Sequence, residues 1–114
     1  DESTAMLDPQ GRKEVLEVAH RLNKEGMTVL LITHFMEEVL DCNKVVVMSN
    51  GHIVATGTPM EIFSNRSLLD EVGLQPPRTV KLARMLKESG LDVDENCTDA
   101  TELGGRVCQL LRKI

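Results

Sequence analysis

Residues Met27 to Thr33 form a continuous apolar run that does not alternate with polar residues. Such a run is typical of a central parallel strand covered on both faces, and it does not suit a strand with one face in water. His34 follows the run directly. The pattern therefore predicts an α/β sheet with His34 just past the carboxyl end of a strand, at the edge where open α/β sheets bind ligands.

The segment before this strand is predicted to be a helix from Asp8 to Gly26. Asp8 can cap the helix, Pro9 suits its first position, and Gly26 can end it. Its apolar residues recur on one face, and they are Val15, Leu16, Ala19 and Leu22. The opposite face is charged, and a face of this kind is more often solvated than functional.

The chain after His34 is predicted to end the sheet with a hairpin. Residues Phe35 to Leu40 read as a short helix and residues Lys44 to Met48 as a valine-rich strand. Asn50-Gly51 separates this strand from a second apolar segment, which predicts a type I′ turn between antiparallel strands.

Beyond the hairpin the sequence predicts short helices. Thr58 can cap a helix that begins at Pro59, and Ser67 to Val72 can form another. Pro76-Pro77 breaks the chain and is the predicted boundary between a domain of residues 1–75 and a helical extension of residues 76–114. In the extension, helices are predicted at 79–89 and, more weakly, at 98–113, where Gly104-Gly105 is expected to interrupt the helix.

The composition narrows the classes of function. The chain has 114 residues, and its formal net charge of -5 argues against a surface that binds nucleic acid. Three cysteines without metal-ligand spacing favour a reducing, cytoplasmic compartment. No apolar run approaches the roughly 20 residues of a membrane-spanning helix. Because the chain begins inside a candidate site and without methionine, we expect it to be a fragment of a longer protein.

Three residues match the needs of a site that cleaves the outer phosphate of ATP. Such a site requires a metal, a group that polarises the attacking water, and a polar contact to the third phosphate. Asp1 could hold Mg²⁺ through its water shell, Glu2 could polarise the water, and His34 could bind the third phosphate. Taken alone, an acidic pair is usually a solvated chain end, and a single histidine after a strand usually has a structural rather than a catalytic role. Their joint order favours the catalytic interpretation.

The segment from Asp1 to Pro9 resembles the end of the Walker B motif and the D-loop of ABC-type ATPases. Leu30 to His34 resembles their switch-histidine loop, and Val45 to Thr58 resembles the end of a transporter ATPase domain. The Met-Leu-Asp-Pro-x-Gly-Arg wording, the Met-Glu-Glu after the histidine and the C-terminal helices are most similar to the energy-coupling factor ATPases. Those proteins power import of vitamins and transition-metal ions. The resemblance implies the C-terminal part of a P-loop NTPase sheet with a terminal hairpin and a small helical extension.

The resemblance also implies a role for each site residue. Asp1 matches the aspartate of the Mg²⁺ site, Glu2 the catalytic glutamate, and His34 the histidine that contacts the third phosphate. Asp8 matches the D-loop aspartate that faces a second ATPase subunit across a dimer, and it can cap a helix at the same time. The implied cofactors are ATP and Mg²⁺. The implied partners are that second subunit and transmembrane transporter components, at the cytoplasmic face of the cell membrane.

Other motifs of such an ATPase are missing from the printed sequence. It contains no Gly-x-x-x-x-Gly-Lys-Ser/Thr loop and no Leu-Ser-Gly-Gly-type signature. We therefore expect this polypeptide alone neither to bind ATP appreciably nor to hydrolyse it. Two alternatives stay open. One is a non-enzymatic docking or dimerisation module that uses the C-terminal helices, and the other is a fragment of an ABC-type ATPase outside transport.

Overall fold

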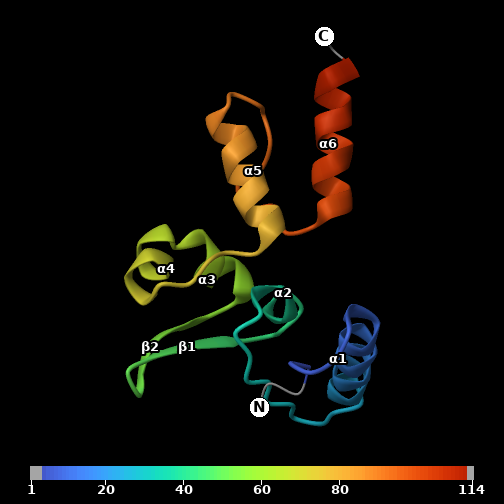
Figure 1. The fold of residues 1–114 in the computed structure, drawn as a ribbon, viewed down its shortest axis with the longest axis vertical. Coiled ribbons are helices and arrows are strands. Elements are labelled where there is room, and N and C mark those ends of the chain that lie inside the picture. Colours follow the sequence, from blue (N-terminus) through green and yellow to red (C-terminus); the bar gives the residue numbers. More distant parts are fainter. Residues whose placement is uncertain (1–3, 113–114) are drawn as a thin grey trace. The chain divides into compact units, whose positions relative to one another are not determined.

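The computed structural model describes residues 4–112, which divide into two compact units between Glu38 and Val39 (Figure 1). The first unit contains one long helix and an extended segment. The second contains a hairpin and four helices, in the order β1, β2, α3, α4, α5 and α6. A short helix, α2, spans Met36–Val39 at the division. Each unit is described by itself below.

The first unit begins with helix α1, Pro9–Lys24, as the sequence predicts. Asp8 caps it, Pro9 occupies its first turn, and Gly26 follows its end with a φ of 100°. Arg21 and Lys24 lie in the last turn, where positive charge complements the helix dipole. None of the α1 residues is buried within the described part of the chain.

The prediction of a strand over Met27–Thr33 is wrong for the described structure. Residues 27–33 carry no regular hydrogen-bonded secondary structure, and Leu30 is 84% exposed. A strand exists only when a neighbouring strand pairs with its backbone groups. Among residues 4–112, the sheet consists of β1 and β2 alone, so the predicted parallel strands before the hairpin are likewise not found there.

The second unit begins with the predicted hairpin. Strand β1, Val45–Ser49, pairs antiparallel with β2, His52–Gly57, and the two lie side by side in Figure 1. The turn residues Asn50 and Gly51 have φ angles of 51° and 77°. A type I′ turn needs positive φ at both central residues, so the predicted Asn-Gly turn is confirmed. The register shifts by a bulge between Val47 and Met48.

Two short helices follow the hairpin, and side chains cap both. Helix α3, Pro59–Ser64, begins with a capping box in which the Thr58 hydroxyl accepts from the Glu61 amide and the Glu61 carboxylate accepts from the Thr58 amide. Helix α4, Arg66–Val72, is capped by Asn65, whose side-chain oxygen accepts from the Leu68 amide at 3.1 Å. It ends at Gly73, which has a left-handed φ of 73°.

The last two helices stand side by side in Figure 1 and share a small core. They are α5, Arg78–Glu88, and α6, Ala100–Arg112. The core consists of Ala83, Val93, Cys97 and Leu103, with Leu86, Leu91, Val107 and Leu110 packed against it. Helix α6 continues through Gly104 and Gly105, contrary to the predicted interruption. Leu103, Val107 and Leu110 recur on one face, and burial of that face outweighs the low helix propensity of glycine.

A polar cluster connects α4, α5 and the loop after α5. The guanidinium of Arg66 lies 3.3 Å from a carboxylate oxygen of Glu88 and 3.2 Å from one of Glu95. The partly exposed Arg66 pairs bring these elements together, although exposed pairs contribute little stability each. Pro76-Pro77 lies between α4 and α5 in the same compact unit, and the predicted boundary between residues 1–75 and 76–114 stays a prediction.

Candidate functional site

The segment after the acidic pair is attached to the helix after His34 by a buried hydrogen bond. The Thr4 hydroxyl donates to the Oε1 carboxylate oxygen of Glu38, and the two residues are 34 positions apart. Thr4 is 0% exposed and Glu38 is 6% exposed. The hydrogen bond therefore joins the segment that precedes Asp8 to the helix that follows His34, within one compact unit.

Asp8 follows Thr4 by four residues and lies at the start of α1. Its Oδ1 atom accepts from the Gly11 amide at 2.8 Å, which satisfies one of the unpaired amides at the helix start. A Cβ atom at position 11 would lie 2.9 Å from that oxygen, so glycine there leaves room for the cap. The capping interpretation of Asp8 is confirmed, and its side chain is exposed as well.

His34 lies on an exposed loop between the extended segment and α2. Its ring stacks on the ring of Phe35, with the centroids 4.4 Å apart and the planes inclined by 32°. The Phe35 amide donates to the Thr33 hydroxyl at 3.0 Å, which shapes the turn at His34. The exposed imidazole can therefore reach a ligand while its orientation is restricted by Phe35.

Arg12 of α1 also contacts this loop. Its guanidinium carbon lies 4.0 Å from the centroid of the Phe35 ring, within the range of a cation–π contact. The sequence pattern alone predicts no role for Arg12, Thr4 or Glu38. The Met-Glu-Glu motif after the histidine contains Glu38 and could have drawn attention to it. The local sequence could not predict the Thr4–Glu38 and Arg12–Phe35 contacts, because each joins positions that are far apart in the chain.

Asp1 and Glu2, the predicted Mg²⁺-site and catalytic carboxylates, lie outside the described residues. Among residues 4–112 there is no group of three histidine, cysteine or acidic side chains that could hold a metal ion. A Mg²⁺ ion bound with ATP keeps several waters and needs only one or two protein carboxylates. The exposed His34 fits a contact to a phosphate, and the fit of Mg²⁺ depends on Asp1.

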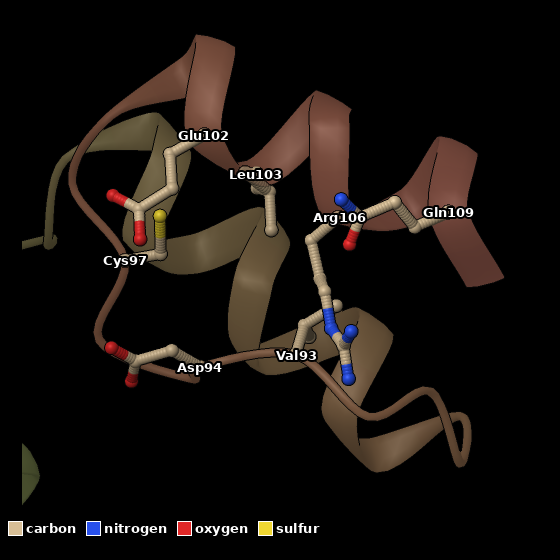
Figure 2. Close-up of a pocket in the computed structure, with 7 residues that line it drawn as sticks. All are labelled: Val93, Asp94, Cys97, Glu102, Leu103, Arg106 and Gln109. Carbon is tan, nitrogen blue, oxygen red and sulfur yellow. The ribbon is translucent and has the colours of Figure 1, made fainter.

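A separate pocket of about 380 Å³ lies between α6 and the loop after α5, away from these residues in the sequence. Figure 2 shows Arg106 extending from α6 toward the loop that carries Val93. Arg106 is already engaged, because its Nη2 lies 2.7 Å from a carboxylate oxygen of Asp92 and its Nε donates to the Asp92 carbonyl. Apolar Val93 and Leu103 line the pocket. The residues that line it all belong to the second unit.

Within residues 4–112, no helix is long and apolar enough to cross a membrane.

Comparison with known proteins gives a consistent result over nearly the whole chain, although no protein-family model matches it. The energy-coupling factor transporter ATP-binding protein EcfA1 of Caldanaerobacter subterraneus subsp. tengcongensis is 46% identical over 110 residues, which cover 96% of this chain and 40% of that protein. EcfA1 of Clostridioides difficile is 46% identical over 111 residues, with the same shares. EcfA1 of Geobacillus kaustophilus is 47% identical over 92 residues, which cover 80% of this chain and 33% of that protein.

The chain thus matches the ATP-binding subunits of ABC transporters. Within that class, it matches the C-terminal portion of an energy-coupling factor ATPase, and the predicted resemblance is confirmed. The chain spans about two fifths of the length of the first two relatives named above.

Proposed function

We propose that this chain is the part of an importer's ATP-binding subunit that completes the site for ATP hydrolysis. The observation that carries the proposal is the 46% identity, over 96% of the chain, to a protein named as a transporter ATP-binding protein. The buried Thr4–Glu38 hydrogen bond supports it, because it ties the segment after Glu2 to the helix after His34. The transported solute would be a vitamin or a transition-metal ion.

Each residue then has a defined task. Glu2 accepts a hydrogen bond from the attacking water and polarises it, and His34 donates its ring N–H to an oxygen of the third phosphate. Asp1 would hold Mg²⁺, which would supply positive charge next to the phosphate oxygens.

The proposed partners follow from the same assignment. Asp8 faces a second ATP-binding subunit in the assembled transporter, and one of its oxygens also caps α1. The subunit works with transmembrane components at the cytoplasmic face of the membrane. Its net charge of -5 does not favour a nucleic-acid partner.

The test is ATP hydrolysis by the full-length subunit that contains this chain, assembled with its partners. We expect Glu2→Gln to lower kcat by about a thousandfold or more while ATP binding persists, because the glutamine cannot polarise the water equally. Glu71→Gln is the matched control, since Glu71 is an exposed carboxylate on α4. Unchanged hydrolysis in Glu2→Gln would rule out the assigned role.

The 114-residue chain by itself should release no phosphate from ATP, since it carries no phosphate-binding loop. Steady phosphate release by the purified chain, abolished in Glu2→Gln, would contradict this expectation.

A further inference from the structure

We propose that Thr4 and Glu38 are positioning residues that couple the segment after Glu2 to the histidine loop. The inference rests on the proposed function for its consequence in catalysis. The coupling itself rests on contacts within the first compact unit. It predicts that loss of a single buried hydroxyl alters the behaviour of a loop about thirty residues away in the sequence.

The Thr4–Glu38 contact is specific. Both side chains are buried, at 0% and 6% exposure, and the Thr4 hydroxyl donates to the Glu38 carboxylate. A buried carboxylate is unfavourable without hydrogen-bond donors, so the contact favours one arrangement of the two segments. Threonine is β-branched and has few χ1 rotamers, which restricts the direction of the donor.

Thr4 is also attached to the segment that follows it. Its carbonyl oxygen accepts from the Leu7 amide at 3.1 Å, which forms the turn before Asp8. Thr4 is therefore held at two points, by its hydroxyl to Glu38 of α2 and by its carbonyl to the turn before Asp8.

Glu38, in turn, is attached to the loop of His34. The Glu38 amide donates to the Phe35 carbonyl at 3.1 Å. The Phe35 ring, in turn, stacks on His34. The path from Thr4 to His34 thus runs through hydrogen bonds and one ring contact.

A parallel contact holds the loop to α1, because Arg12 stacks on Phe35 independently of Thr4. Removal of the Thr4 hydroxyl should therefore loosen the position of the loop without detaching it. Misplacement of a reacting group by about 1 Å can cost on the order of a hundredfold in rate.

The experiment compares Thr4→Val, Thr4→Ser and Glu38→Gln in the full-length subunit. Valine keeps the shape of threonine without the donor, serine keeps the donor, and glutamine keeps an acceptor oxygen. Thr28→Val is the matched control, because Thr28 is an exposed threonine in the same unit. The readouts are amide hydrogen exchange over residues 33–36, the Kd for ATP and the kcat of hydrolysis.

We expect Thr4→Val to speed exchange over residues 33–36 by about fivefold or more while exchange in α6, the internal reference, stays unchanged. We expect kcat to fall by about tenfold or more with less than about a twofold change in Kd, and Thr4→Ser to restore both readouts. For Glu38→Gln, the exchange rate over residues 33–36 and the kcat should each lie between the values of wild type and Thr4→Val.

Three results would overturn the inference: exchange over residues 33–36 equal to that of Thr28→Val, faster exchange that is uniform through α6, or failure of Thr4→Ser to restore the loop. The hydrogen-exchange readout decides the coupling whether or not the subunit hydrolyses ATP. If wild-type subunit shows no hydrolysis, the proposed function fails while exchange still tests Thr4 and Glu38.

Discussion

The guanidinium of Arg84 on α5 donates to the carbonyl oxygen of Phe63 in the last turn of α3, 21 residues earlier. Arg84 is 9% exposed and Phe63 is 2% exposed. Carbonyls at a helix end have no partner within the helix, so a buried one needs a donor from elsewhere. Arg84 also donates to the side-chain oxygen of Asn96 at 3.3 Å, which connects the loop after α5 to the same point.

The environment of Arg84 opposes its charge. Burial lowers the pKa of Arg84 from its ordinary value, and the positive charge of Arg66 lowers it further, while Glu95 and Asp70 act in the opposite direction. The arginine is therefore held by its hydrogen bonds to neutral acceptors rather than by a direct carboxylate pair among the described residues.

Arg84→Met should lower the free energy of unfolding of the second unit by about 2 kcal/mol, because the Phe63 carbonyl would remain buried without its donor. Urea denaturation followed by circular dichroism measures the change. Arg78→Met, at an exposed position of the same helix, is the control and should be near neutral. Equal or greater stability in Arg84→Met would indicate that burial of the charge outweighs its hydrogen bonds.

Gly104→Ala and Gly105→Ala should each raise the free energy of unfolding by about 1 kcal/mol, because alanine has the higher helix propensity. A Cβ atom at either position meets no described atom within 4 Å. Gly73→Ala is the contrasting control, since its φ of 73° strains any residue with a Cβ atom and should make that variant less stable. Thermal melts of the three variants test the order. A loss of stability in either α6 variant would contradict the prediction.

Asp8→Ala should lower stability by about 1 kcal/mol through loss of the cap on α1, whereas Asp8→Asn keeps an acceptor oxygen and should be near neutral. Asparagine lacks the charge that the proposed contact with a second subunit would use. Asp8→Asn therefore separates the capping role of this residue from its proposed contact with a second subunit. A normal melting temperature together with reduced ATP hydrolysis in the assembled transporter would support both roles. Normal hydrolysis would leave the cap as the role of Asp8.

Phe35→Leu should shift the NMR signals of the His34 ring, because the aromatic ring 4.4 Å away would be removed. The signals of His20 and His52 serve as internal controls, since neither ring has a stacking contact with Phe35 among the described residues. The variant should also lose about 0.5–1 kcal/mol of stability with the Arg12 cation–π contact. Unchanged His34 signals would show that the stacking does not persist in solution.

Local chemistry made several elements predictable. The Asn50-Gly51 turn, the Asp8 and Thr58 caps and the glycine after α1 depend on residues within a few positions of one another. The continuity of α6 through Gly104 and Gly105 was not predictable in this way. Its stabilising contacts come from Ala83 on α5 and from the Val93–Cys97 segment, which the local pattern does not reveal.

The sequence by itself determined the caps at the starts of α1 and α3, where the hairpin turns, and which protein family the site segments resemble. Backbone propensity, capping and turn geometry act over a few residues, and so do the motifs that carry the resemblance. Only the tertiary structure decided that Thr4 pairs with Glu38, that Arg12 stacks on Phe35, and that Arg84 reaches the Phe63 carbonyl. It also decided the state of residues 27–33, because a strand requires backbone partners that its own sequence cannot supply.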